Sequence, residues 1–167
     1  MHRLNHAVLY VRDVAASVAF YQDVLGFRTV NRFSGAAFLQ APGSTNDHDL
    51  GLFEVGAQAG PSAAGRSTVG LYHLAWEVDT LGELQRLAGV LSAAGALVGA
   101  SDHSTTKALY AKDPDGIEFE VCWLVPADRI DAAVKDGAAG TRRLDLAKEI
   151  ERYGADTRGG VGVSLPA

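Results

Sequence analysis

Two stretches of the chain alternate apolar and polar residues in the same order. The segments "LNHAVLYVRD" (4–13) and "LYHLAWEVDT" (71–80) share a leucine, a histidine two positions later, an alternating apolar run and a closing aspartate. Alternation with a period of two residues predicts a strand that has one buried face. His6 and His73 occupy equivalent positions in the two segments. The chain therefore contains one internal repeat.

A helix is predicted after each of these strands, because apolar residues follow at helical spacing. They are Val14, Val18, Tyr21 and Leu25 in the first copy, and Leu81, Leu84, Leu87 and Leu91 in the second. Asp13 and either Asp79 or Thr80 are suited to cap these helices. Gly26 and Gly95 stand where the chain must leave them.

Three short strand patterns complete each copy. They cover residues 27–33, 36–40 and 49–55 in the first copy, and residues 97–101, 107–111 and 117–125 in the second. Each copy is thus an α+β module of the order βαβββ. One module is too small to bury both faces of its own sheet, so we expect the two to pair.

These patterns divide the chain into two regions. A domain over residues 1–126 contains module one (4–56), a Gly-rich linker (57–70) and module two (71–125). Residues 127–167 form a helical extension with a loose end, which we expect to pack on the outside of the domain or on a partner subunit.

Composition excludes several classes of protein. The 167 residues are 47% hydrophobic and 21% charged, which is typical of a compact globular protein. A net charge of -5 without a Lys/Arg-rich run argues against nucleic-acid binding. We also expect a cytoplasmic protein with no membrane partner, since no apolar run approaches the ~18 residues of a membrane span. Cys122 is the only cysteine, so any metal must be held by His, Asp or Glu.

A metal site follows from the orientation of the strands. In "GIEFEVCW" the apolar residues alternate with Glu120, so this glutamate points away from the helix. His73 lies opposite the bulky residues of its own strand, and the repeat brings His6 to the equivalent place. A lone strand histidine is usually a hydrogen-bonded core residue. Two equivalent histidines and an inward glutamate instead favour the two-His-one-carboxylate set of Fe(II) sites.

The whole pattern resembles the vicinal oxygen chelate superfamily over residues 4–125. This superfamily includes glyoxalase I, the bleomycin resistance proteins, the fosfomycin resistance enzymes and the type I extradiol dioxygenases. One of the more specific marks is the Asp-Pro-Asp-Gly turn (113–116), which is followed four residues after its glycine by Glu120. The resemblance implies two βαβββ modules paired into a funnel-shaped, partly closed mixed sheet. It also implies a divalent metal at the floor, held by the first and last strands.

The stretch "NDHDLGLFEV" (46–55) separates the reaction classes of this superfamily. Glyoxalase I, which this chain resembles, binds its metal with a fourth protein ligand. That ligand is a carboxylate in the last strand of the first module, at the position equivalent to Glu120. The apolar pair Leu50 and Leu52 should face the helix, which places Gly51 at that position. Glu54 has the parity of the leucines and points away. The vacant fourth position favours the extradiol dioxygenases.

The resemblance assigns further roles. "HDLGL" (48–52) is similar to a His-Asp-x-Ala-Leu stretch of extradiol enzymes, which makes His48 the acid/base residue and Asp49 a substrate-binding candidate. Tyr110 stands ten residues before Glu120 and would hydrogen-bond a substrate hydroxyl, with His103 beside it in the substrate-binding set. The structural alternatives are a solvated turn residue for His48, a core aromatic for Tyr110 and a polar loop residue for His103.

The sequence therefore predicts an extradiol dioxygenase that cleaves a catechol-type aromatic with O₂ at Fe(II), in the breakdown of aromatic compounds. Mn, Zn or Ni are the alternative metals. A glyoxalase-like lyase or isomerase, a thiol transferase, and a non-catalytic antibiotic-binding protein stay open as alternatives. The partly apolar helix of the extension makes a homodimer plausible.

Overall fold

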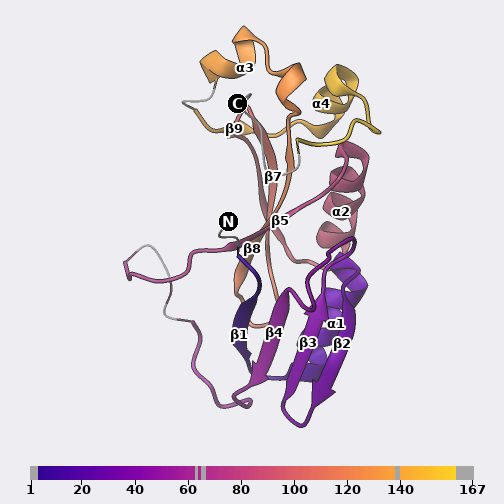
Figure 1. The fold of residues 1–167 in the computed structure, drawn as a ribbon. Helices are drawn as coiled ribbons and strands as arrows, with labels where there is room; N and C mark the ends of the chain where they lie inside the picture. Colours follow the sequence, from indigo (N-terminus) through magenta and orange to yellow (C-terminus); the bar gives the residue numbers. More distant parts are fainter. Residues whose placement is uncertain (1–3, 63, 65–66, 138–139, 161–167) are drawn as a thin grey trace. The chain divides into compact units, whose positions relative to one another are not determined.

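The computed structural model describes residues 4–62, 64, 67–137 and 140–160. The chain forms two compact units (Figure 1). Unit 1 comprises Met1–Thr68 and Asp113–Ile117, and unit 2 comprises Val69–Lys112 and Glu118–Ala167. Module one (4–56) lies in unit 1, whereas module two (71–125) is divided, because its turn Asp113–Ile117 belongs to unit 1 and the rest to unit 2. The described part of the C-terminal extension belongs to unit 2.

Unit 1 is a βαβββ module with a mixed four-stranded sheet. Its elements are β1 (Ala7–Val11), α1 (Val14–Leu25), β2 (Arg28–Phe33), β3 (Ala36–Gln40) and β4 (Leu50–Glu54). The strand order is β1-β4-β3-β2, and β1 runs parallel to β4 while the other pairs are antiparallel. The element order predicted from the sequence is confirmed.

Helix α1 begins and ends where its cap residues dictate. The Asp13 carboxylate accepts hydrogen bonds from the backbone N–H groups of Ala15 and Ala16, at 2.8 and 3.0 Å. Gly26 ends the helix in the left-handed region at φ 72°, which a residue with a Cβ adopts only with strain. The apolar side of α1 covers the sheet face that carries the buried Leu9 and Leu52.

Unit 2 repeats the module and adds a strand. Its elements are β5 (Leu74–Glu77), α2 (Leu81–Ala93), β6 (Leu97–Asp102), β7 (Thr106–Lys112) and β8 (Glu118–Leu124). With the added strand β9 (Arg142–Arg143), the order is β5-β8-β7-β6-β9, and β5 runs parallel to β8. Thr80 caps α2 by accepting from the Glu83 N–H at 3.2 Å. The helix buries Leu81, Leu84, Leu87 and Leu91, as the sequence predicts.

The C-terminal extension differs from its prediction in two ways. It contains η1 (Ala127–Arg129), α3 (Ala132–Gly137) and α4 (Leu146–Tyr153), but also β9 (Arg142–Arg143), which pairs with β6. The described part of the predicted loose end is also held in place. The Trp123 indole N–H donates to the Thr157 carbonyl at 3.1 Å, and the Gly160 N–H donates to the Leu124 carbonyl at 2.9 Å. Residues 161–167 lie outside the described residues.

The Asp-Pro-Asp-Gly turn between β7 and β8 belongs to unit 1. Asp113 folds the turn by accepting from the backbone N–H groups of Asp115 and Ile117, and its other oxygen accepts from the Tyr21 hydroxyl at 3.3 Å. Asp115 accepts from both the backbone and the guanidinium of Arg12, at 2.9 and 2.7 Å. Asp113 and Asp115 therefore attach the turn to Tyr21 and Arg12 of module one.

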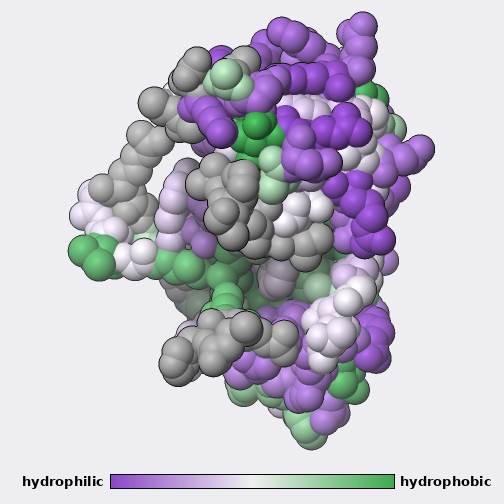
Figure 2. Space-filling view, turned by 45° about the horizontal axis from the view of Figure 1, so that its top comes forward, coloured by the Kyte–Doolittle hydropathy of each residue, from purple (hydrophilic) through white to green (hydrophobic). Residues whose placement is uncertain are grey.

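None of the helices in the described part of the chain is long and apolar enough to cross a membrane. The C-terminal extension presents mainly charged side chains to solvent, and the hydrophilic colour predominates at the top of Figure 2, where this extension comes forward.

Candidate functional site

The centre of the candidate site in unit 2 is a contact between His73 and Glu120. The imidazole Nε2 lies 3.0 Å from the Glu120 Oε2, and both side chains are largely buried, at 22% and 11% exposed. His73 directly precedes β5 rather than lying within it, which corrects the longer strand predicted from the sequence. Glu120 lies in β8, where Ala75 is its partner across the parallel pair.

This pair has the geometry of two ligands to one metal ion. Two donor atoms at about 2.1 Å from an ion and at a right angle to each other are about 3 Å apart, which matches the Nε2–Oε2 distance. The Nδ1 atom of His73 is buried without a hydrogen-bond partner. The donor set of imidazole and carboxylate suits Fe(II), Mn(II) or Zn(II). His73 and Glu120 therefore fit a divalent metal.

Tyr110 and His103 extend this cluster along the same sheet. Tyr110 in β7 lies directly across from Glu120 in the antiparallel pair, because the hairpin places residues ten apart side by side. Its ring centroid is 5.6 Å from that of His73. The His103 Nε2 lies 2.9 Å from the Tyr110 hydroxyl, which joins the two predicted residues by a hydrogen bond.

The surroundings of Tyr110 keep its hydroxyl protonated. Burial, followed by the negative charge of Glu120, raises the pKa of Tyr110 to about 12. Burial and the same carboxylate also raise the pKa of Cys122 to about 12, so this thiol stays neutral and packs as a small apolar residue. At neutral pH Tyr110 can therefore donate a hydrogen bond.

In unit 1, His6 and His48 form a second cluster. Their ring centroids are 4.5 Å apart, and the Phe38 ring contacts His48 at 4.9 Å. His6 is exposed and precedes β1, as His73 precedes β5. His48 lies in the bend before β4, with its Nδ1 at 3.2 Å from the Asp47 carboxylate. The structure thus brings two of the predicted site residues together in this unit.

The strand register confirms the predicted place of Gly51. Val8 of β1 pairs with Gly51 of β4, and Ala75 of β5 pairs with Glu120 of β8, so glycine occupies the repeat equivalent of the glutamate. A Cβ at Gly51 would lie 3.3 Å from Val8 and 3.4 Å from Phe38. These side chains occupy the space into which a ligand at this position would extend.

Glu54 and Asp49 serve the local structure of unit 1. The Glu54 carboxylate accepts from the Val14 N–H at 3.0 Å and so supports the start of α1, as its predicted orientation requires. Asp49 is buried, and its carboxylate accepts from the Ala41 N–H, the Ser44 hydroxyl and the Asn46 amide, at 2.8, 2.8 and 2.7 Å. These three donors engage Asp49 in holding its own loop, so we propose no substrate contact for it.

The predicted site residues therefore lie in two groups. His6 and His48 are in unit 1, whereas His73, Glu120, Tyr110 and His103 are in unit 2. Among the described residues, no three His, Cys, Asp or Glu side chains gather as a metal-binding group. Sequence reasoning missed Thr141, whose hydroxyl lies 3.1 Å from the His103 Nδ1, because a lone threonine in an irregular segment carries no periodic signal.

The profile of the Glyoxalase/Bleomycin resistance protein/Dioxygenase superfamily matches residues 3–121. The chain belongs to this superfamily. Among curated members, it is 33% identical to a catechol-2,3-dioxygenase of Bacillus subtilis (strain 168) over 121 residues, which are 71% of this chain and 40% of that protein. It is also 33% identical to a biphenyl-2,3-diol 1,2-dioxygenase 3 of Rhodococcus globerulus over 125 residues, which are 71% of this chain and 62% of that protein.

The chain thus spans about two fifths to three fifths of these two relatives. Solved structures of the superfamily share its fold. A glyoxylase/bleomycin resistance protein/dioxygenase domain from Frankia sp. EAN1pec has a TM-score of 0.61 at 24% identity, covering 73% of this chain and 91% of that one. A lactoylglutathione lyase from Agrobacterium tumefaciens has a TM-score of 0.54 at 23% identity, covering 72% and 92%.

Proposed function

We propose that the protein is an extradiol dioxygenase, which opens the ring of a catechol-type aromatic with O₂. The observation that carries this proposal is the register of β4 and β8, which gives the second unit a carboxylate at Glu120 and the first unit Gly51 in its place. A site with only three protein ligands leaves positions for a bidentate substrate and O₂. The names of the two curated relatives support the same class of reaction.

In the proposed site, His73 and Glu120 hold the metal together with His6. Bound Fe(II) would lower the pKa of a coordinated catechol hydroxyl and provide a position for O₂. The proposal requires His6 of unit 1 to meet His73 and Glu120 of unit 2, either within one chain or across a homodimer. The exposed apolar residues Val8 and Tyr10, 51% and 74% exposed on the face of β1 opposite α1, support such pairing.

The remaining residues of the chain bind and orient the substrate and transfer its protons. Tyr110 donates a hydrogen bond to a substrate hydroxyl, and His103 holds the Tyr110 hydroxyl in place. His48 accepts a proton from the substrate and returns it as the ring opens. Phe38, which contacts His48, limits the access of water to this side. Both atoms of O₂ enter the product, a ring-opened semialdehyde acid, so no external reductant is needed.

Anaerobic reconstitution with Fe(II) tests the reaction. We expect the protein to consume one O₂ per molecule of catechol, 3-methylcatechol or 2,3-dihydroxybiphenyl and to form a coloured ring-cleavage product. The His73→Ala and Glu120→Gln variants should lose both the iron and the activity, whereas Glu118→Gln, in the same strand, should retain both. Absence of O₂ uptake with every catechol would refute the proposal. Activity with Ni, Zn or Mn on a thiohemiacetal would instead indicate a glyoxalase-like enzyme.

Mixing of inactive variants tests how the ligands are assembled. His6→Ala supplies an intact unit 2, and His73→Ala supplies an intact unit 1. If each site combines units from two chains, mixed dimers contain one complete site in two, and random mixing restores about a quarter of the activity. If both units of one chain form the site, mixing restores none. Full iron binding by His6→Ala alone would exclude His6 as a ligand.

A further inference from the structure

The turn that carries His103 is held by the C-terminal extension. His103 lies between β6 and β7, and β9 of the extension pairs with β6 through Ser101 and Arg143 and through Asp102 and Arg142. Thr141 immediately precedes β9, and its hydroxyl lies 3.1 Å from the His103 Nδ1. The extension therefore reaches the residue that contacts Tyr110.

The backbone of this turn is strained and needs support. Ser104 has φ 68°, and it is the one non-glycine residue with a positive φ in the described part of the chain. A residue with a Cβ adopts this conformation only with strain, and it persists only where the surroundings impose it. Asp102 accepts from the Ser104 N–H at 2.8 Å, and the Arg142 guanidinium donates to the Ser104 hydroxyl at 3.1 Å.

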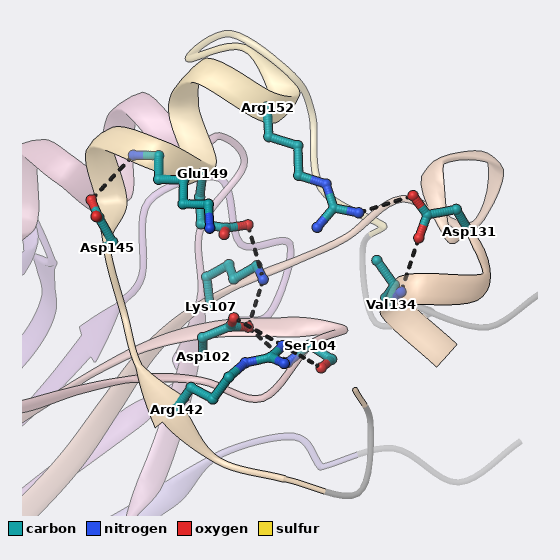
Figure 3. Close-up of polar contacts among 10 residues, drawn as sticks. Asp102, Ser104, Lys107, Asp131, Val134, Arg142, Asp145, Glu149 and Arg152 are labelled. Atoms are coloured by element: carbon teal, nitrogen blue, oxygen red, sulfur yellow. Dashed lines mark hydrogen bonds and ion pairs between the residues drawn. The ribbon is translucent and has the colours of Figure 1, made fainter. Parts of the chain in front are cut away.

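A buried ion cluster anchors the extension to the same turn (Figure 3). Lys107 is 1% exposed, and its ammonium lies 2.6 Å from Asp102 and 3.0 Å from Glu149 of α4. Arg142 approaches the second oxygen of Asp102 at 3.4 Å. Thr141 therefore directly precedes a segment whose two ends are held, at Arg142 by Asp102 and at Glu149 by Lys107.

We propose that Thr141 is a positioning residue for the candidate site: its hydroxyl fixes the ring of His103 in one tautomer and orientation, and His103 in turn aims the Tyr110 hydroxyl at the substrate. The inference deepens the proposed dioxygenase function and rests on it. The His103 ring has partners on both nitrogens, Thr141 and Tyr110, at 3.1 and 2.9 Å. Both partners are hydroxyls, which can donate or accept, so the proton position follows from the proposed role of Tyr110. Because the Tyr110 hydroxyl donates to the substrate, its oxygen accepts from the His103 Nε2, and Nδ1 is left to accept from the Thr141 hydroxyl.

Two substitutions at Thr141 separate the hydroxyl from the shape of the side chain. Thr141→Val retains the branched shape and removes the hydroxyl, whereas Thr141→Ser keeps the hydroxyl. Thr157→Val is the matched control, since the Thr157 hydroxyl bonds to the Tyr153 carbonyl in the same extension and has no link to His103. In full-length protein labelled with ¹⁵N-histidine, we expect the ring nitrogens of His103 to report one tautomer in the native protein and Thr141→Ser. In Thr141→Val they should report a mixture.

Kinetics with a catechol supply the second measurement. Loss of one neutral hydrogen bond predicts a roughly fivefold lower kcat/KM for Thr141→Val, with values near native for Thr141→Ser and Thr157→Val. Unchanged His103 signals in Thr141→Val would overturn the positioning role, even with an active enzyme. The tautomer measurement does not depend on turnover. If His103 responds as expected but the protein is inactive with every catechol, the dioxygenase function is refuted while the positioning of His103 by Thr141 is supported.

Discussion

Replacement of Lys107 by methionine should strongly destabilise unit 2. The side chains of Lys107, Asp102 and Glu149 are 2%, 11% and 9% exposed, so removal of the cation leaves Glu149 without this counter-charge and Asp102 with only the more distant, exposed Arg142 at 3.4 Å. Breaking a buried ion pair in this way costs about 3–5 kcal/mol, compared with less than about 1 kcal/mol for an exposed pair. At roughly 2–4 °C per kcal/mol, Tm should fall by about 6–20 °C.

The loss of stability caused by Lys107→Met should depend on pH in a defined direction. Burial acts to raise the pKa of Asp102, but the hydrogen bonds from Lys107 and Ser104 and the nearby cations outweigh it and lower the pKa. In the native protein Asp102 thus adds stability above its ordinary pKa of about 3.9, and loses it as the pH falls through its lower folded value. Without the lysine, burial should raise this pKa, so the folded variant binds a proton more readily than the unfolded chain.

The difference in unfolding free energy between native protein and Lys107→Met should therefore shrink as the pH falls from about 7 to about 4. Urea unfolding followed by tryptophan fluorescence measures this difference, because Trp76 and the fully buried Trp123 both lie in unit 2. Arg86→Met is the control, because Arg86 and its partner Glu83 are 53% and 39% exposed. Its cost should stay below about 0.5 kcal/mol.

A second variant separates charge from packing. Lys107→Met combined with Asp102→Asn and Glu149→Gln removes the uncompensated charges, and it should recover most of the lost stability at pH 7. A cost below about 1 kcal/mol for Lys107→Met, or a cost that does not change with pH, would refute the buried ion cluster as the source of this stability. Failure of the triple variant to recover would assign the loss to packing.

Three further substitutions test the construction of unit 1. Asp115→Asn weakens the charged contact with Arg12 and should cost about 1–3 kcal/mol in urea unfolding; a cost near zero would show that the turn is held by other contacts. Tyr21→Phe removes the hydroxyl that donates to Asp113 and should cost about 1 kcal/mol, and an increase in stability would contradict this bond. Gly26→Ala places a Cβ at φ 72° and should lower the unfolding free energy by about 1 kcal/mol; an unchanged Tm would refute the strain.

The repeat and the local patterns of the sequence suffice to predict most of the fold. The alternation with a period of two predicted which strand residues share a face of the sheet. The helical spacing, together with Asp13 and Gly26, predicted the bounds of α1. The place of Gly51 also followed from the sequence, because pairing within a repeated module conserves register. The sequence placed His6 and His73 inside their strands, whereas both precede them. These are errors of element boundaries, because the alternation of apolar and polar residues extends beyond the residues that pair in the sheet.

Other features depend on residues far apart in the sequence. Asp49 looked like a site residue because of its neighbour His48, but its oxygens turn to its own loop. Glu149 reads as a solvated residue of an amphipathic helix, yet it is buried beside Lys107. Tyr110 and Glu120 are an intermediate case, since a hairpin of regular strands makes their contact predictable once both strands are known.

The sequence by itself therefore determined the two βαβββ modules, their helix caps, and the residue types available to bind a metal, because these follow from local periodicity and side-chain chemistry. Only the tertiary structure decided that β9 joins the sheet, that Lys107 is neutralised by α4, and that Thr141 reaches His103. Such contacts are selected by burial and charge compensation between distant segments, which leave no repeating pattern along the chain.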